Sequence, residues 1–328
     1  MTEAVVTAPV AGTTSTKVWV DDGSSGLGAR VLRRLVSATD VVQGAPADSE
    51  VLVWLGAHDI DALAERRESA LQGLQVALAA HPALRHVVLV SSAMVYGAWA
   101  NNPVPLTEDA ALRPDVEFAY ARQLGAVEQL VDEWRQAEAG RSVTVLRPVV
   151  AMAADGTSGL AAALAAGMGQ RIGESDPPAQ FLHLDDLADA VMVGVRGRLD
   201  GVYNVAPDGS IPGERVRALA GAVPRLRLPD RVNEVVLNLR WRFQRGPIPP
   251  GLRSYTMWPW LVANDKLKAA GWRPNVTNEQ AYVEGTEAKW WTMVSPKRRQ
   301  EVALGGLVIG VLAGVLLVVR AVRRARVR

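Results

Sequence analysis

Short apolar runs alternate with longer amphipathic segments along the first half of the chain. The runs are rich in Val and Leu, whereas the longer segments carry apolar residues at helical spacing. This alternation is typical of parallel strands that helices cover on both faces. We therefore predict an α/β fold with a doubly wound parallel sheet, built from strands at 17–20, 41–43, 51–55, 86–90 and 143–146 and helices at 28–37, 60–80 and 119–137.

The pattern loosens after Arg147-Pro148. Pro-rich stretches separate the elements predicted there, which are helices near 158–168, 185–196 and 213–221 and a strand at 202–205. We predict a smaller lobe beside the carboxyl ends of the strands, where open α/β sheets bind ligands. The predicted organisation is a disordered lead-in at 1–16, a sheet domain at 17–150, and the smaller lobe with a connector at 151–296.

The segment 302–319 contains no charged or polar side chain. As a helix it would be about 27 Å long, close to the roughly 30 Å hydrocarbon core of a bilayer. A buried core helix is the alternative, but basic residues flank both ends, so we predict a transmembrane helix followed by a basic tail at 320–328. Gly306, Gly310 and Gly314 form a stripe through which two copies could associate, although glycine is common in membrane helices generally.

The charge divides the chain into two unlike parts. The 328 residues carry 36 Lys and Arg against 34 Asp and Glu, a net charge of +2. Residues 297–328 alone carry +7, which leaves −5 on the rest. An acidic body argues against nucleic-acid binding. The lack of cysteine excludes disulfides, a thiolate nucleophile, zinc fingers and iron–sulfur sites, and the four histidines do not suggest a metal site.

Two features disagree about the orientation of the predicted membrane helix. Five basic residues follow it and three precede it, which favours a cytoplasmic C-terminus. The first residues, MTEAVVTAPVAGTTST, lack the basic and apolar regions of a signal peptide. Export of a large α/β body normally needs such a signal. We therefore expect a cytoplasmic body held by a C-terminal single-pass anchor, whose arginines contact anionic membrane lipid.

Four segments together resemble the extended short-chain dehydrogenase/reductase (SDR) family, the NAD-dependent sugar epimerases and dehydratases. They are VWVDDGSSGLGARVLRRL at 18–35, VVLVSSAMVYG at 87–97, FAYARQL at 118–124 and QFLHLDDLADAV at 180–191, and the resemblance continues in GVYNVAPDG at 201–209 and NDKLKAAGWRP at 264–274. The resemblance implies a Rossmann fold that binds NAD or NADP. It also implies that a Ser and a Tyr-x-x-x-Lys pair transfer protons beside the hydride transfer.

In this family a glycine-rich turn holds the phosphates of the cofactor. The matching positions here are Gly23, Ser24, Ser25, Gly26, Leu27 and Gly28. The family pattern is Thr-Gly-x-x-Gly-x-x-Gly. Aligned on Gly28, Asp21 and Asp22 replace the Thr and the first Gly, and Ser25 replaces the second Gly. A carboxylate there would repel phosphate, so a strand–helix turn without a nucleotide is the alternative interpretation.

The segment that reads the ribose and adenine in this family has no clear counterpart. The family places an acidic or basic residue at the end of the second strand, followed by a helix and a further aspartate. Here only residues 44–50 separate the second and third predicted strands. The adenine half of the pocket is therefore predicted to be deleted.

Ser92 and Tyr120 match the catalytic serine and tyrosine of the family. A phenol with a pKa near 10 is a weak base at neutral pH, and the family's lysine one turn later lowers that pKa. Leu124 stands at the lysine position, and Arg122 points to the other side of a helix. Ser92 and Tyr120 are the candidate catalytic residues, with packing or ligand contact as the alternative.

These features predict a membrane-anchored, epimerase/dehydratase-like protein with lost or reduced dehydrogenase chemistry. It would act as a ligand-binding or scaffold protein for an unidentified small molecule. The alternative is an active NAD(P)-dependent oxidoreductase or epimerase on a nucleotide sugar or related substrate, which uses Ser92 and Tyr120. A third possibility is a body that mainly binds a protein partner.

Overall fold

A computed structural model describes residues 15–55, 64–169, 176–220 and 251–286. The described residues up to Thr286 belong to one compact unit. Most of the predicted lead-in lies outside the described residues. The predicted transmembrane helix at 302–319, its three glycines and the basic tail at 320–328 also lie outside them.

Six parallel strands form the main sheet, in the order β2-β1-β3-β4-β5-β8. The strands are β1 (Thr16–Val20), β2 (Val41–Gln43), β3 (Val51–Trp54), β4 (His86–Val90), β5 (Ser142–Pro148) and β8 (Gly201–Val205). The central strands β3 and β4 are buried at every residue, which is why their sequences are continuous apolar runs rather than alternating ones. The predicted doubly wound parallel sheet is therefore confirmed.

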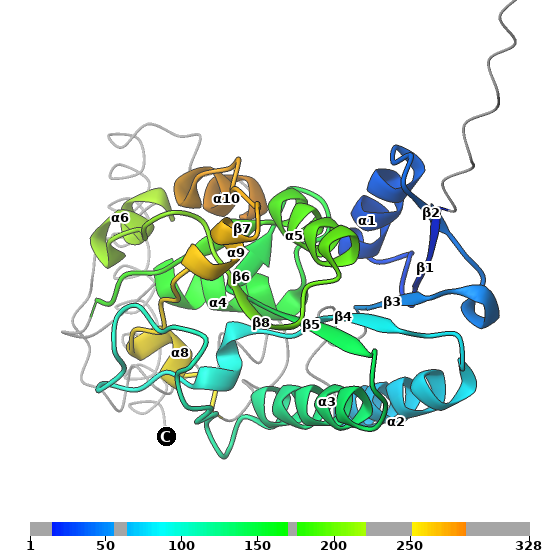
Figure 1. The fold of residues 1–328 in the computed structure, drawn as a ribbon. Helices are drawn as coiled ribbons and strands as arrows, with labels where there is room; N and C mark the ends of the chain where they lie inside the picture. Colours follow the sequence, from blue (N-terminus) through cyan, green and yellow to red (C-terminus); the bar gives the residue numbers. More distant parts are fainter. Residues whose placement is uncertain (1–14, 56–63, 170–175, 221–250, 287–328) are drawn as a thin grey trace, which may run out of the picture. The chain divides into compact units, whose positions relative to one another are not determined.

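Helices cover both faces of this sheet (Figure 1). On one face α1 (Gly26–Val36) packs beside α5 (Leu184–Gly197), and on the other α2 (Ala64–Ala80) packs beside α3 (Ala119–Gln136). In α1 the side chains of Leu27, Val31 and Leu35 are buried, the spacing of a helix that rests one stripe on a sheet. The sequence predicted all four helices, with ends that differ by one or two residues where they can be compared. The predicted start of the helix at 60–80 lies outside the described residues.

A second, two-stranded parallel sheet lies beside the carboxyl ends of the main strands. It pairs β6 (Val150–Met152) with β7 (Phe181–His183). The sequence analysis did not predict these strands, because three residues are too few to show a strand pattern. Around them lie α4 (Gly159–Gly169), α6 (Gly213–Leu219), α8 (Ser254–Met257), α9 (Asp265–Ala269) and α10 (Asn278–Gly285).

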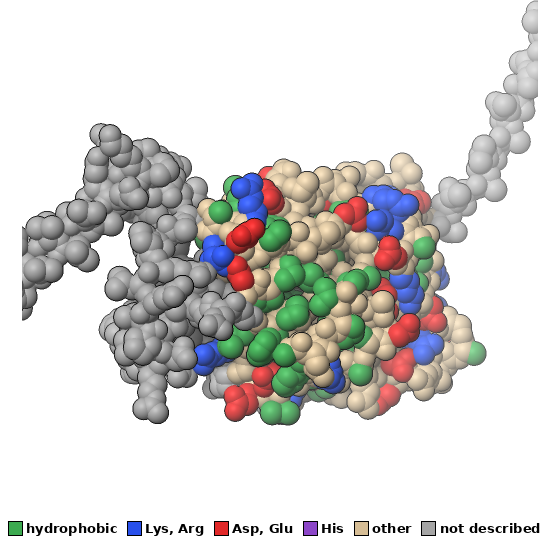
Figure 2. All heavy atoms as spheres, turned by 90° about the vertical axis from the view of Figure 1, so that its left-hand side faces the viewer, with side chains coloured by type: hydrophobic (Ala, Val, Ile, Leu, Met, Phe, Trp, Pro, Cys, Tyr) green, Lys and Arg blue, Asp and Glu red, His purple; other side chains and the backbone are tan. Residues whose placement is uncertain are grey.

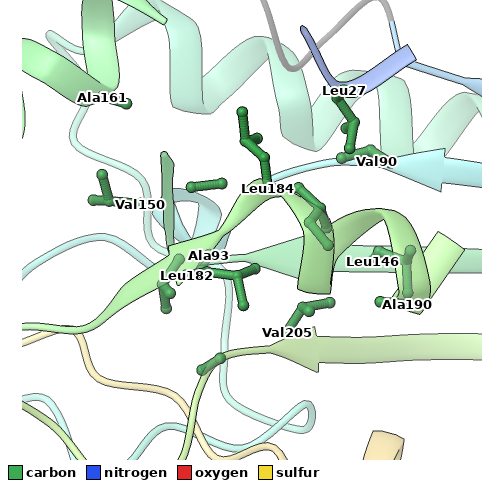
Figure 3. Close-up of a cluster of buried hydrophobic side chains, with 14 of the residues drawn as sticks. Leu27, Val90, Ala93, Leu146, Val150, Ala161, Leu182, Leu184, Ala190 and Val205 are labelled. Carbon is green, nitrogen blue, oxygen red and sulfur yellow. The ribbon is translucent and has the colours of Figure 1, made fainter. Parts of the chain in front are cut away.

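One hydrophobic core joins the main sheet to these later elements. Figure 3 shows buried side chains from both regions, which belong to one hydrophobic cluster, among them Leu146 of β5, Leu182 of β7 and Ala161 of α4. Figure 2 shows an outer face of the later elements, where apolar side chains gather across the middle and charges of both signs surround them. On this face the basic side chains lie among acidic ones.

The main sheet ends at β2. Dinucleotide-binding sheets commonly have the order 3-2-1-4-5-6, with a further strand beyond the second one. Here residues 44–50 contain only the short 3-10 helix η1 (Pro46–Asp48) and lead directly to β3, on the other side of β1. Between Gln43 and Val51, all of which the structure describes, the usual outer strand and its helix are absent.

None of the helices in the described part of the chain is long and apolar enough to span a membrane.

Candidate functional site

The glycine-rich turn joins β1 to α1 at the carboxyl edge of the sheet. Two adjacent carboxylates, those of Asp21 and Asp22, accept hydrogen bonds from backbone N–H groups at this edge. Asp21 Oδ1 accepts the backbone N–H of Leu55 at 2.6 Å, which ties the end of β1 to the end of β3. Asp22 Oδ1 accepts the Ser24 hydroxyl at 2.9 Å and the backbone N–H of Ser25 at 3.2 Å. A negative group therefore already lies at the N-terminus of α1, the position that favours an anion.

Ser25 is the N-cap residue of α1. Its hydroxyl accepts the backbone N–H of Gly28 at 2.9 Å and donates to the backbone oxygen of Asp22 at 3.0 Å. A Cβ on Gly28 would lie 1.8 Å from that oxygen of Asp22, so only glycine fits there. The turn is thus closed by its own side chains and backbone.

A loop that follows β6 lies against the same turn. A Cβ on Gly26 would come within 2.7 Å of the Cα of Gly156. Arg30 holds the two segments together, since its guanidinium donates to the backbone oxygen of Gly26 at 2.9 Å and to the carboxylate of Asp155 at 2.5 Å. This hydrogen bond and the Arg30 charge lower the pKa of Asp155 below its usual range.

The predicted phosphate site was tested against this geometry. A pyrophosphate at the turn would meet the Asp22 carboxylate, which already accepts the Ser25 N–H, and it would compete with Gly156 for the surface of Gly26. Among the described strands, β2 has no outer neighbour that would complete the adenine side. The internal carboxylate and the contact with Gly156 therefore oppose the phosphates of NAD or NADP at the six turn residues, Gly23 to Gly28. Their cofactor role remains a prediction.

Ser92 and Tyr120 are brought together at one cavity. Ser92 caps η2 (Ala93–Tyr96), where its hydroxyl accepts the backbone N–H of Met94 at 3.2 Å. Tyr120 lies in the first turn of α3 and is buried. The remaining lining is mostly apolar and includes Leu160, Leu164 and Trp260. The cavity holds about 30 Å³, room for one or two water molecules, whereas sites for small-molecule ligands usually measure roughly 300–1,000 Å³.

The position of the family's lysine is part of the core. Leu124 follows Tyr120 by one turn of α3 and is 2% exposed, while Arg122 is exposed to solvent. Among the described residues that line the cavity, none is charged. A substrate in this cavity would therefore find no cationic side chain among the described lining residues. The described residues also contain no group of three side chains that could hold a metal ion.

A buried ion pair between Arg147 and Glu128 is hydrogen-bonded to Ser91, the residue before Ser92. The sequence analysis did not predict this pair. Arg147 of β5 binds both oxygens of Glu128 on α3, at 2.6 and 3.1 Å. It also donates to the hydroxyl of Tyr96 at 2.8 Å, and Ser91 donates to Glu128 at 2.5 Å. Burial raises the pKa of the Tyr96 phenol, against the opposing charge of Arg147. The pair fixes α3, and with it Tyr120, against the sheet.

The order of these elements agrees with known proteins. Residues 54–206 match the model of the NAD dependent epimerase/dehydratase family. The match begins inside β3 and ends just after β8, so it contains Ser92 and Tyr120 but not the glycine-rich turn. It supports the family that the sequence motifs resemble.

Solved structures of epimerases and dehydratases share the fold. The structure of RMD from Pseudomonas aeruginosa complexed with NADPH is 19% identical with a TM-score of 0.60, over 82% of this chain and 97% of that one. A dTDP-glucose 4,6-dehydratase from Bacillus anthracis in complex with NAD is 15% identical with a TM-score of 0.55, over 86% and 98%. A UDP-glucose 4-epimerase from Thermotoga maritima with UDP-glucose is 16% identical with a TM-score of 0.55, over 85% and 100%.

The curated relatives that match this chain have names that state no activity. Uncharacterized proteins of Mycobacterium bovis and Mycobacterium tuberculosis are 28% identical over 145 residues. The matched region is 44% of this chain and 38% of those proteins, so the chain spans well under half the length of these relatives.

Proposed function

We propose that this chain is an epimerase/dehydratase-like protein that has lost dinucleotide-dependent hydride transfer and acts as a ligand-binding or scaffold protein. The observation that carries the proposal is the Asp22 carboxylate at the N-terminus of α1, where it accepts the backbone N–H of Ser25. An internal anion at this place competes with the phosphates of a cofactor. The missing outer strand and the buried Leu124 support the same conclusion from two other parts of the site.

Titration of the full chain in mild detergent with NADH and NADPH tests this proposal. We expect no binding up to millimolar cofactor by calorimetry. Dissociation constants in the micromolar range for the wild-type chain would contradict the proposal. The Asp22→Gly variant provides the matched comparison, because it removes the internal carboxylate and restores the family's residue at that position.

A second candidate function rests on the cavity that Ser92 and Tyr120 share. In this alternative the chain is an active NAD(P)-dependent oxidoreductase or epimerase on a nucleotide sugar or related substrate. Ser92 and Tyr120 would each offer a hydroxyl to the reacting oxygen. Turnover of UDP-glucose or dTDP-glucose that falls at least about a hundredfold in Ser92→Ala and Tyr120→Phe would favour this alternative.

The proposal also includes attachment to a membrane through residues 302–319, with the body in the cytoplasm and the basic residues at 320–328 on anionic lipid. The apolar composition of 302–319 and its basic flanks support it. Because the chain has no cysteine, a single introduced thiol reports its own side of the membrane. We expect Ser37→Cys to react with a membrane-impermeant maleimide only after cell lysis. Reaction in intact cells would contradict a cytoplasmic body.

A further inference from the structure

Helix α1 is covered on only one of its flanks. Its buried stripe rests on the sheet, and on one side Arg34 binds Asp189 and the backbone oxygen of Asp185 on α5. Figure 1 shows α5 beside α1 on that side and no described helix beyond α1, above the edge strand β2. On the other flank, the side chains of Arg33 and Val36 are exposed to solvent.

The bare flank follows from the strand order. Crossovers between parallel strands are right-handed, so a helix that led from β2 to a strand outside it would lie on the same face as α1 and next to it. Residues 44–50 replace that helix and strand with the short η1. The surface of α1 that a neighbouring helix would normally bury is exposed instead.

This flank forms an apolar groove with one charge. The groove is shallow and largely open to solvent, and it is lined by Gly23, Ala29, Leu32, Arg33, Val36 and Ser37. Val36 is 80% exposed, more than any other large hydrophobic side chain in the described part of the chain. Ala29, Leu32 and Val36 recur at helical spacing, and the small Ala29 allows a second helix to approach closely. Arg33 forms no ion pair within the described part of the chain.

We propose that this groove binds an amphipathic helix of a partner protein, which rests an apolar stripe on Leu32 and Val36 and sets a carboxylate against Arg33. The charge of the groove argues against a second copy of the chain. In a two-fold pair of antiparallel α1 helices, the axis would pass near Leu32 and Arg33, since these residues are central to the stripe from Ala29 to Val36. Each Arg33 would then face its own copy, a like-charge contact that disfavours association.

Photo-cross-linking in the native cells tests this proposal. The full chain carries benzoylphenylalanine at position 36 or, as the matched control, at the exposed Val283 of α10. We expect position 36 to cross-link to a segment of another protein that has helical apolar spacing and an acidic residue. Arg33→Glu, a change at an exposed residue, should lower the yield roughly tenfold or more, because it replaces an attraction with a repulsion.

The other outcomes would overturn the proposal. They are a cross-link between two copies of this chain, a yield at position 36 no higher than at position 283, a cross-linked segment without acidic residues, and a yield that Arg33→Glu does not change. Far-UV circular dichroism and the melting temperature of Arg33→Glu confirm that a lost cross-link does not come from unfolding.

Discussion

The side-chain oxygen Oδ1 of Asp22 lies 3.2 Å from the backbone nitrogen of Ser25 and accepts its hydrogen bond. The two residues close the turn before α1 in the way that a bound anion would close it. The carboxylate is part of the chain, so it is present at a fixed position whether or not a ligand is bound. This contact would link the stability of the turn to the proposed loss of affinity for phosphate.

Replacement of Asp22 by Ala should lower the free energy of unfolding by about 1 kcal/mol. The change removes a hydrogen-bond acceptor and a favourable charge from the N-terminus of α1. Urea unfolding at neutral pH measures this loss. Asp48→Ala is the matched control, because Asp48 is exposed in η1 and its expected effect lies within about 0.5 kcal/mol. Equal stability of the two variants would show that the Asp22 contact contributes nothing.

Gly26→Ala should destabilise the protein by roughly 1–3 kcal/mol. The new methyl group would meet the backbone of Gly156 at 2.7 Å, and a backbone atom cannot move aside as a flexible side chain can. Gly125→Ala in α3 is the opposite case, because a Cβ there has no neighbour within 4 Å. It should stabilise the protein by about 0.5–1 kcal/mol through helix propensity. Thermal unfolding of both variants compares them, and destabilisation by Gly125→Ala would contradict this account.

Arg147→Met should cost about 3–5 kcal/mol, because it leaves the Glu128 carboxylate buried and unpaired. The double variant Glu128→Leu/Arg147→Met removes both charges and should recover a large part of that loss. Denaturant unfolding of the two single variants and the double variant gives the coupling free energy. Additive losses would show that the two side chains do not stabilise each other.

His86 should make the protein less stable in mild acid. Burial, assisted by the nearby charge of Arg198, lowers the pKa of this histidine to about 4. The unfolded chain, with an ordinary pKa near 6.5, therefore binds the proton first as the pH falls. Stability that is fully present above pH 6.5 is lost progressively down to about pH 4, by roughly 3 kcal/mol in total.

Urea unfolding between pH 7 and pH 4.5 measures this dependence. His86→Asn should flatten it, since asparagine does not titrate. A pH dependence that is the same in both proteins would assign the acid sensitivity to other groups.

The sheet was predictable because its strands are buried on both faces. Runs such as HVVLV at β4 leave no other interpretation when amphipathic helices follow them. The short loop at 44–50 also predicted that the adenine half of the pocket is deleted, and the observed order β2-β1-β3, with no described strand outside β2, agrees with that prediction. Both predictions rested on the pattern and length of short segments of the sequence.

The contacts between distant segments were not predictable. Nothing near Gly26 in the sequence indicates that Gly156 lies against it. The partner of Arg147 is Glu128, which lies on α3 rather than on β5. Because acidic side chains are seldom fully buried, the sequence contained no sign that Glu128 faces the core. The positions of Ser92 and Tyr120 came from a motif, but the small size of their cavity depends on side chains from several later elements.

Leu124→Lys restores the family's residue and separates the two proposed functions. In a chain that has lost the cofactor, the new ammonium group would be buried beside apolar side chains, and the free energy of unfolding should fall by roughly 2–4 kcal/mol. Millimolar NADH should not raise the melting temperature of this variant. If a cofactor pocket remained, NADH at about a hundred times its dissociation constant would stabilise the protein by about 2.7 kcal/mol.

Gln129→Lys is the control, because it places the same charge on the exposed side of α3, and its stability should stay within about 0.5 kcal/mol of the wild type. Stabilisation of Leu124→Lys by NADH would contradict the loss of the dinucleotide site and favour the active enzyme.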